Sequence, residues 1–541
     1  MTYFCSMSLP VGRQIHRILI IQPESEHMKK SAIWLLLCIF SFQFIIAQPK
    51  YEFRGVWIAT VNNIDWPMAG VSEPEKQKAD YIRLLDMHQR NGMNAMIVQV
   101  RPAADAFYPS PYEPWSEWLT GTQGKPPSPY YDPLQFMIEE THKRGMEFHA
   151  WLNPYRAIHN INGSSIASNH ITRIHPEWFL TYGDKKYFDP GNKEAQKFVV
   201  TVVRDIVKRY DVDAIHMDDY FYPYRIPGKE FPDAESYIKS GSKLNKDDWR
   251  RSNTDSIIQA LSIAIKQGKK LCRFGISPFS VWRNNDKDPV RGSDSRGGQT
   301  NYDDLYADIL LWLEKRWIDY VTPQLYLEIG HPKIDYVKML DWWSRNSYGR
   351  HIYIGHGIYR AGGKEAAWNN PAQLPDQIKL LRRYPNVQGS IYFSSKSFSR
   401  NPNGWNDSLQ NNYYRYPALL PPMRWIDNEK PWPPIVERTI TNDSIIELTA
   451  RPDPRNRVEI KYYVVYQYAA DSHSETFGNV PKYISRLITT PAGFKLTEPL
   501  SSKHYSYRYV ITAVGKNNNE SDLSEIAILV QPGGKWEFYK P

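Results

Sequence analysis

The sequence predicts an α/β protein, with a (β/α)8 barrel followed by a small C-terminal β-sandwich. Eight apolar runs alternate with amphipathic helical stretches between residues 53 and 394, which indicates parallel strands covered by helices on both sides. Eight such strands in about 350 residues favour a closed barrel over an open doubly wound sheet. No Gly-rich phosphate loop follows the first strand, where a dinucleotide-binding fold would carry one.

The barrel elements follow from the apolar runs and from the helical periodicity between them. The predicted strands are FRGVWIAT (53–60), AMIVQVRP (95–102), EFHAWLNP (147–154), DAIHMDD (213–219), RFGISPF (273–279), YVTPQLY (320–326), IYIGHGI (352–358) and GSIYFS (389–394). The predicted helices lie at 75–91, 132–144, 194–210, 248–267, 302–316, 334–346 and 372–384. Long connections rich in Trp, Tyr, Pro and Gly follow four strands, at 61–74, 103–131, 155–193 and 220–247. They would gather on one face of the barrel, as a binding cleft requires.

Residues 1–47 are predicted to be an N-terminal extension and a signal peptide. The apolar run SAIWLLLCIFSFQFIIA (31–47) follows two lysines and ends in a small residue, Ala47, which suits cleavage before Gln48. A membrane anchor is the alternative, because the 17 residues of the run reach the lower limit for spanning a bilayer. We therefore expect export, to the periplasm, the cell envelope or the medium. The exported chain would keep only Cys272 and could form no intrachain disulfide.

The remaining chain divides by composition into a barrel at 48–420, a Pro-rich linker at 421–434 and a β-rich module at 435–541. The linker reads PPMRWIDNEKPWPP, and the short alternating runs beyond it are SIIELTA, EIKYYVVYQY, YSYRYVITAV and EIAILV. Turn residues separate these runs, a pattern that resembles a fibronectin type III sandwich. Such modules act as spacers or docking surfaces, so no chemistry is assigned to this part.

The charge and aromatic content narrow the class of partner. The net charge is +9, spread along the chain without a basic tract, whereas nucleic-acid binding requires a concentrated patch. Aromatic residues make up 14% of the chain and crowd the segments after predicted strands, which suits the flat faces of sugar rings. We expect a polysaccharide or oligosaccharide as partner, with association at an envelope surface. Neither a nucleic acid nor a cofactor is predicted.

The segment AIHMDDYFYP (214–223) provides the strongest candidate site. Asp218 and Asp219 end the fourth strand, and the carboxyl ends of barrel strands are where such folds place their chemistry. Glycosidic hydrolysis generally uses two carboxyl groups, one as acid and one as nucleophile or base. Strand alternation favours Asp218, which shares a face with His216, and Asp219 is the close second. Repulsion between them would raise one pKa toward the role of the acid. Alternatively, one of them caps the loop or pairs with Arg225.

The sequence does not identify the second catalytic carboxyl group. Glu328 after the sixth strand and Asp105 after the second are candidates, and Glu113 is a further one. The fifth and seventh strands carry no acid at the positions that other barrel enzymes use.

Further candidates would bind the substrate. The proposed sugar platforms are Trp57, Trp66, Trp115, Tyr222 and Trp282. Arg101 and Arg156 would meet a carboxylate or lactyl group on the glycan. Polar side chains at alternating strand positions suggest a polar barrel mouth, and they include His149, Asn153, His216, Gln324, Tyr326 and His356. With Asp218, the three histidines would make a zinc site for a polysaccharide deacetylase, but the chain has no H-x-H pair. Histidines that hydrogen-bond a polyol are therefore preferred, and no metal is predicted.

Several long motifs resemble the glycosyl-hydrolase-like family ten. They are EFRGVWIATVNNIDWP, VQVRPAADAFYPSPYEPWSEWLTG, DPLQFMIEETHKRGMEFHAWLNPYRA, IHMDDYFYP and PQLYLEIG, within residues 51–420. The resemblance implies an exported TIM-barrel glycosidase of bacterial envelopes, and one family member is associated with cleaving peptide-free peptidoglycan strands. It also implies cleft positions for Arg101, Asp105, His149, Asn153, Tyr155, Arg156, Asp218, Asp219, Tyr222, Gln324 and Tyr326. Leu327 and Glu328 depart from the polar or aromatic residue that is common there. The main hypothesis is a glycoside hydrolase, and the rival is a non-catalytic glycan-binding scaffold.

Overall fold

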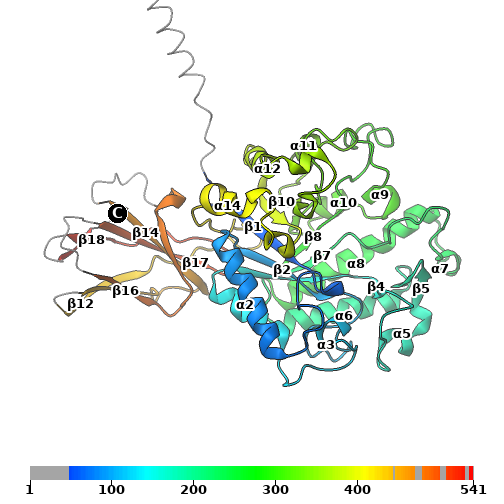
Figure 1. The fold of residues 1–541 in the computed structure, drawn as a ribbon, viewed down its shortest axis with the longest axis horizontal. Helices are drawn as coiled ribbons and strands as arrows, with labels where there is room; N and C mark the ends of the chain where they lie inside the picture. Colours follow the sequence, from blue (N-terminus) through cyan, green and yellow to red (C-terminus); the bar gives the residue numbers. More distant parts are fainter. Residues whose placement is uncertain (1–47, 443–444, 470–477, 500–506, 531–534, 540–541) are drawn as a thin grey trace, which may run out of the picture. The chain divides into compact units, whose positions relative to one another are not determined.

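Eight parallel strands close into a barrel in the order β1-β11-β10-β9-β8-β7-β3-β2, which confirms the predicted fold class (Figure 1). The computed structural model describes residues 48–442, 445–469, 478–499, 507–530 and 535–539. The barrel strands are β1 (Phe53–Ile58), β2 (Ala95–Arg101), β3 (Glu147–Leu152), β7 (Ala214–Met217), β8 (Arg273–Ile276), β9 (Tyr320–Val321), β10 (His351–His356) and β11 (Val387–Tyr392). The predicted N-terminal extension and signal peptide, 1–47, lie outside the described residues. Among the described helices, none is long and apolar enough to cross a membrane.

Helices surround the barrel strands (Figure 1), and apolar residues of the main helices share one core with those of the strands. The main helices are α2 (Pro74–Arg90), α4 (Pro133–Lys143), α6 (Lys193–Arg209), α8 (Lys246–Gly268), α10 (Ile309–Glu314), α11 (Tyr336–Arg345) and α12 (Gln373–Leu381). Side-chain oxygens of Asp132, Asn192, Asn245 and Asp335 accept first-turn N–H groups and so begin α4, α6, α8 and α11. Shorter helices lie in the connections: α3 (Glu117–Thr120), α5 (Ile171–Ile174), α7 (Ala234–Ser240), α9 (Asn301–Asp304), α13 (Ser395–Phe398) and α14 (Trp405–Ser408).

Two predicted elements differ from the structure. The predicted helix 302–316 is broken into α9 and α10, because Tyr306 between them has a φ of 51°, which a right-handed helix does not allow. The predicted strand 320–326 is reduced to two residues, since Pro323 has no N–H to donate to a neighbouring strand.

The interior of the barrel is filled by aromatic and histidine side chains. Gly275 leaves room for the ring of Tyr320, because a Cβ at position 275 would lie 1.9 Å from the ring carbon Cζ. The Tyr320 hydroxyl lies 2.9 Å from Nδ1 of His149 and 3.0 Å from Nδ1 of His216. His216 in turn accepts a hydrogen bond from the indole of Trp57, at 3.3 Å. The barrel is therefore packed rather than hollow, as small barrels are.

The directions of these hydrogen bonds follow from Trp57, because an indole N–H can only donate. His216 accepts at Nε2 and therefore donates from Nδ1 to Tyr320, whose hydroxyl donates to His149. His149 then donates from Nε2 to Glu147, at 3.1 Å. Burial lowers the pKa of His216, which agrees with its neutral state in this chain.

Beneath the barrel, Glu147 at the start of β3 joins the C-terminal module to the barrel. Its carboxylate accepts hydrogen bonds from Arg273 at 2.6 Å, from Lys461 at 2.8 Å and from Asn518 at 2.9 Å. Burial alone would raise the Glu147 pKa, but the charges of Arg273 and Lys461 outweigh it and hold the pKa well below its usual value. Residues 48–541 form one compact unit, within which this buried cluster links the two parts.

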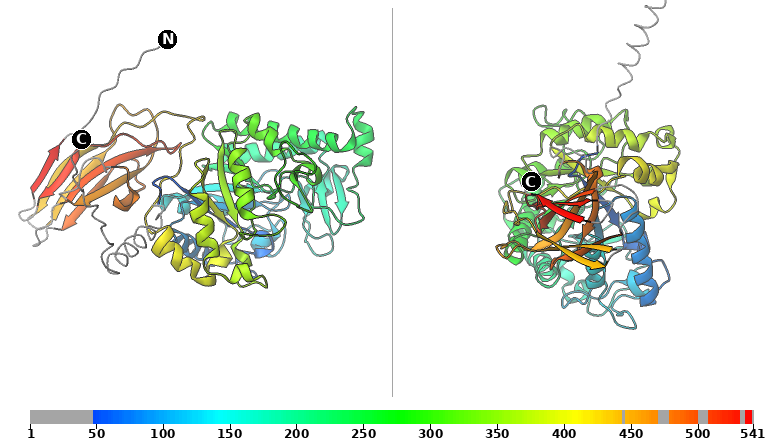
Figure 2. Two further views of the ribbon diagram at one scale, coloured as in Figure 1. Left: turned by 90° about the horizontal axis from the view of Figure 1, so that it is seen from above. Right: turned by 90° about the vertical axis from the view of Figure 1, so that its left-hand side faces the viewer.

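The module itself consists of two antiparallel sheets (Figure 2). One sheet holds β12 (Ile435–Asn442), β13 (Ile445–Arg451) and β16 (Phe494–Pro499), and the other holds β15 (Ile484–Ile488), β14 (Ile460–Ala469), β17 (Tyr507–Gly515), β18 (Ile526–Val530) and β19 (Lys535–Tyr539). Leu448 and Leu496 of the first sheet share an apolar core with Val465 and Ile511 of the second. The β-sandwich is thus confirmed, and it includes four strands outside the predicted runs: β12, β15, β16 and β19. The fibronectin type III likeness and the domain boundaries stay predictions.

Long connections follow the barrel strands on the predicted face. After β3 the chain forms an antiparallel sheet of β4 (Arg156–Ile158), β6 (Lys185–Phe188) and β5 (Phe179–Tyr182). This extra sheet places Arg156 beside the carboxyl ends of the barrel strands, where a cavity opens.

Candidate active site

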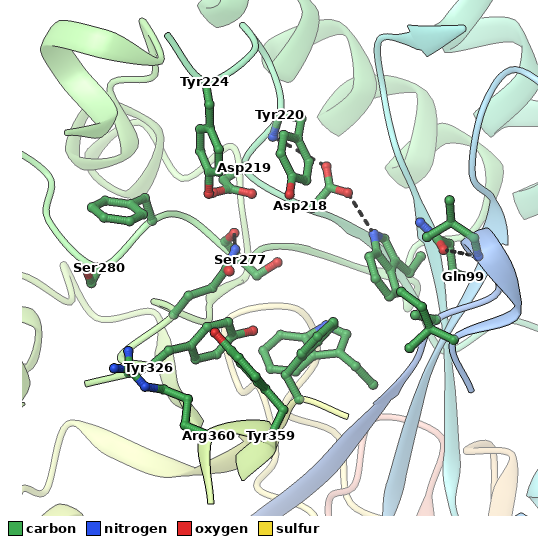
Figure 3. Close-up of a pocket in the computed structure, with 18 of the residues that line it drawn as sticks. Gln99, Asp218, Asp219, Tyr220, Tyr224, Ser277, Ser280, Tyr326, Tyr359 and Arg360 are labelled. Carbon is green, nitrogen blue, oxygen red and sulfur yellow. Dashed lines mark hydrogen bonds between the residues drawn. The ribbon is translucent and has the colours of Figure 1, made fainter. Parts of the chain in front are cut away.

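A cavity of about 450 Å³ lies at the carboxyl ends of the barrel strands (Figure 3). Six residues predicted from the sequence line it: Trp57, Arg156, Asp218, Asp219, Gln324 and Tyr326. Eight aromatic side chains contribute to the wall: Trp57, Trp151, Tyr220, Tyr224, Phe279, Tyr326, Tyr359 and Phe393. A polar pocket with aromatic walls suits a ligand that combines hydroxyl groups with flat apolar faces.

Asp218 is held in place by two side chains from the end of β3. Nδ2 of Asn153 lies 3.1 Å from both carboxylate oxygens, and the indole of Trp151 donates to Oδ2 at 3.2 Å. Asp218 is 4% exposed, and burial raises its pKa, while the positive charge of Arg156 opposes the rise. Asn153, which the sequence places at the site, does not line the cavity. It lies behind the cavity wall and orients Asp218.

Asp219 lies beside Asp218 but has a different partner. The hydroxyl of Tyr224 donates to its carboxylate. Burial and the adjacent charge of Asp218 raise the pKa of Asp219 to about 7. Strand alternation does not separate the two aspartates, because β7 ends at Met217 and both side chains reach the cavity. Arg225 pairs with Asp304 at 2.9 Å, so the alternative pairing with Arg225 does not describe this site.

The aromatic residues form two facing walls. Figure 3 shows Tyr220 and Tyr224 next to the aspartates, with Tyr326 and Tyr359 on the other side of the cavity. The rings of Tyr326 and Tyr359 meet edge to face, with centroids 5.9 Å apart. Sequence reasoning missed Phe279, Tyr359 and Phe393 as lining residues. All three follow strand ends, so the position in each strand–loop junction is the signal that would have found them.

Only one of the two predicted arginines reaches the cavity. Arg156 lines it and donates from Nε to the carbonyl of Pro102 at 3.0 Å. Among the ion pairs of the described chain, none involves Arg156. Arg101 is instead buried against Glu113, with 2.6 Å between Nη2 and Oε1, and so cannot meet a ligand there.

Three of the five proposed sugar platforms are buried in the protein interior, which corrects the sequence prediction. Trp66 is 0% exposed and donates to the carbonyl of Gln77 at 3.0 Å. Trp282 is 1% exposed and donates to Asp308 at 3.2 Å. Tyr222 is 1% exposed because its ring packs on neighbouring aromatic rings. Their apolar character reflects core packing rather than ligand binding.

Trp115 and Tyr155 also lie away from the cavity wall. Trp115 packs edge to face on Tyr130, with ring centroids 6.3 Å apart. Tyr155 is fully buried, and burial raises the pKa of its hydroxyl. Of the predicted aromatic residues, Trp57 and Tyr326 are the ones brought to the cavity.

The predicted second carboxyl groups have other partners. Asp105 is fully buried, accepts from the backbone N–H of Ala103 at 3.1 Å, and has a pKa raised by burial to about 7. Glu328 accepts a hydrogen bond from the indole of Trp368 at 3.2 Å. Neither lines the cavity, so the structure groups Asp218 with Asp219 and with no third predicted acid.

The three predicted histidines are buried and hydrogen-bond to other side chains of the barrel. His149 and His216 bond Tyr320, and His356 lies 2.8 Å from Gln377 and 3.0 Å from Ser390. Burial lowers the pKa of His356 to about 4. In the part of the chain that the structure describes, no three His, Cys, Asp or Glu side chains gather as a metal site would require.

A parallel barrel that holds paired buried carboxyl groups in an aromatic pocket is the arrangement of glycoside hydrolase-type proteins. The chain belongs to the family described as glycosyl hydrolase-like 10, whose sequence profile matches residues 52–370. This membership confirms the resemblance inferred from the motifs.

Curated relatives carry matching descriptions. Glycosyl hydrolase YngK of Bacillus subtilis (strain 168) is 41% identical over 512 residues, which cover 92% of this chain and 98% of the relative. Glycosyl hydrolase DigH of Escherichia coli (strain K12) is 38% identical over 371 residues, 64% of this chain and 83% of the relative. Among solved structures, the glycoside hydrolase domain of PgaB (BpsB) from Bordetella bronchiseptica aligns with a TM-score of 0.41 and 13% identity, over 66% of this chain and 98% of that domain.

Proposed function

We propose that the protein is an exported glycoside hydrolase that cleaves glycosidic bonds in a bacterial or environmental polysaccharide. The observation that carries the proposal is the pair of buried carboxyl groups, Asp218 and Asp219, in the aromatic cavity at the barrel mouth. Export rests on the apolar run at residues 31–47. Family membership and the names of the relatives support the glycosidase class.

The two aspartates differ in a way that suits two roles. With a pKa of about 7, Asp219 keeps its proton near neutral pH and can protonate the oxygen of the departing sugar. Asp218 accepts hydrogen bonds from Asn153 and Trp151, which stabilise its carboxylate form and fix its direction. Its negative charge would stabilise the oxocarbenium-like transition state. The aromatic walls would hold sugar rings on both sides of the bond.

For the identity of the polysaccharide, we propose the glycan strand of peptidoglycan without its peptides. Such a strand exposes lactyl carboxylates, and Arg156, which forms no ion pair with the described residues, places a guanidinium in the cavity wall. The net charge of +9 would also favour an anionic polymer.

Digestion of a glycan panel by the purified protein tests this function. The panel includes peptidoglycan with and without peptides, and mass spectrometry reads the products. We expect shortened oligosaccharides with the wild-type protein and a loss of about 10²–10⁴-fold in rate for Asp219→Asn, because general acid catalysis contributes that much. Asp218→Asn should also lose turnover, whereas the control Glu328→Gln should keep it. Polymers that bind but stay intact would replace the proposal with the non-catalytic glycan-binding scaffold.

A further inference from the structure

Both carboxyl groups of the cavity enter it from the same side. Asp218 and Asp219 are consecutive residues directly after β7, so their side chains extend from one strand end. Figure 3 shows them together, with Tyr326, Tyr359 and Arg360 across the cavity. Of the described residues that line the cavity, these two are the carboxylates; the rest are aromatic, aliphatic, hydroxyl, amide or guanidinium side chains.

Two acids near the cavity wall are engaged in other interactions. Asp65 accepts hydrogen bonds from the backbone N–H of Ala59 at 2.7 Å and from the hydroxyl of Ser394 at 2.8 Å, which join the loop after β1 to the end of β11. Glu328 is bonded by Trp368. Neither acid lines the cavity, so neither stands opposite the aspartate pair as a nucleophile.

This one-sided arrangement restricts the mechanism of bond cleavage. In the common glycosidase mechanisms two carboxyl groups flank the scissile bond, one on the side of the leaving group and the other on the opposite face of the sugar. A pair on one wall can protonate the leaving oxygen but cannot also attack the anomeric carbon from behind. The nucleophile must then come from another source, and some glycosidases take it from the substrate.

A 2-acetamido group supplies such a nucleophile, because its carbonyl oxygen can reach the anomeric carbon of its own ring. As that oxygen attacks, the amide nitrogen becomes positively charged and its N–H requires an acceptor. Asp218 suits this task, since Asn153 and Trp151 hold both its oxygens in fixed positions next to Asp219.

We infer that the sugar on the non-reducing side of the cleaved bond is a 2-acetamido-2-deoxy sugar whose own carbonyl oxygen is the nucleophile. This inference rests on the proposed glycosidase function, whose peptidoglycan substrate consists of such sugars, and it adds the source of the nucleophile and the role of each aspartate. Asp219 gives its proton to the glycosidic oxygen while the C1–O bond breaks and the carbonyl oxygen bonds C1. Asp218 accepts the hydrogen bond from the amide N–H of the resulting oxazolinium ion.

The second half of the reaction restores both aspartates. Water attacks C1, Asp219 takes a proton from that water, and the bond from C1 to the carbonyl oxygen breaks to regenerate the acetamido group. C1 is inverted twice, so the product keeps its configuration, and Asp219 carries its proton again.

A matched series of N-acyl glycans tests the inference with the wild-type protein. Peptide-free glycan strands are de-N-acetylated and then re-acylated with either acetyl or trifluoroacetyl groups, and new reducing ends are counted. Fluorine withdraws electrons from the carbonyl oxygen without removing the N–H, so we expect the trifluoroacetyl strand to be cut about 100-fold more slowly, a typical size for a catalytic group. Equal rates on the two strands would overturn the substrate nucleophile and leave the glycosidase function intact. Failure to cut any glycan of the panel would instead overturn the glycosidase function.

A binding experiment gives an independent measurement. The 1,2-fused thiazoline of N-acetylglucosamine is a stable analogue of the cyclic intermediate, and calorimetry would measure its Kd. We expect it to bind at least about tenfold tighter than N-acetylglucosamine, because analogues of reactive species bind more tightly than substrates. Asp218→Asn should remove this preference, whereas Glu328→Gln should not. Equal affinity for the two sugars in the wild-type protein would contradict the inference.

Discussion

The hydroxyl of Tyr224 donates a hydrogen bond to the carboxylate of Asp219, while the adjacent Asp218 takes its hydrogen bonds from Asn153 and Trp151. Two neighbouring residues of the same type thus have different surroundings. Different surroundings are what allow one carboxyl group to keep its proton and the other to lose it at the same pH.

The pH dependence of turnover should report the protonation of Asp219. Its raised pKa of about 7 means that the acid form predominates below pH 7 and is lost above it. We expect kcat/KM to fall with increasing pH on an alkaline limb centred near pH 7, by about tenfold per unit. A pH–rate profile of the wild-type protein checks this, and a profile that stays flat from pH 6 to pH 9 would rule out Asp219 as the acid.

Removal of the Tyr224 hydroxyl should move that limb upward. The hydrogen bond from Tyr224 stabilises the charged form of Asp219 and lowers its pKa, so Tyr224→Phe should raise the pKa of Asp219 further. The alkaline limb would then lie at higher pH. Tyr359→Phe is the matched control, because Tyr359 lines the same cavity on the opposite side. A downward shift in Tyr224→Phe, or the same shift in both variants, would contradict this assignment.

The two arginines that the sequence grouped together should behave differently. Arg101→Met would leave the buried Glu113 without its partner, and such a loss costs about 3–5 kcal/mol of stability. Arg156→Met should lower the melting temperature less, because it removes one hydrogen bond and no ion pair within the described chain, and it should raise the KM for a carboxylate-bearing glycan. Thermal melts and steady-state kinetics on both variants separate the two effects. A stable Arg101→Met protein with a raised KM would return Arg101 to the ligand site.

Stability at low pH should depend on Glu147. Its folded-state pKa is held well below the ordinary value of 4.5, so its contribution is fully present above about pH 4.5 and is lost as the pH falls toward the lowered value. Glu147→Gln should lower the free energy of unfolding at pH 7 by about 3–5 kcal/mol, because it leaves the buried Arg273 without its ion-pair partner and leaves Lys461 with Asp213, at 3.6 Å, as its remaining ion-pair partner. The exposed Glu459 is the control, and Glu459→Gln should change stability by less than about 0.5 kcal/mol. Denaturant unfolding between pH 3 and pH 7 measures both variants.

Much of the fold was accessible from the sequence because each barrel strand is a continuous apolar run. The breaks at Tyr306 and Pro323 are local backbone effects inside such runs, so periodicity alone does not place them. Strands β12, β15, β16 and β19 are short and interrupted by charged or polar residues, and they were missed for that reason.

The candidate site was accessible only in part. Asp218 and Asp219 stand out because two acids at the end of a buried strand are unusual, and Arg156 stands out because it closely follows the predicted third strand, 147–154. Residue type alone does not show whether Trp66, Trp282 and Arg101 are buried or line a cavity, since a tryptophan or an arginine can contact either a ligand or a buried partner. Long-range contacts with Gln77, Asp308 and Glu113 decide that these three side chains are buried.

A row of hydrogen bonds inside the barrel connects the cavity wall at Trp57 to Glu147, which residues of the C-terminal module contact. Trp57, His216, Tyr320 and His149 all donate in the same direction, and the row ends on the anion of Glu147. Lys461 and Asn518 of the module help to keep that anion charged. A residue more than three hundred positions away in the chain therefore stabilises the anion that accepts the last hydrogen bond of this row. Replacing the module would remove that support as well as a spacer.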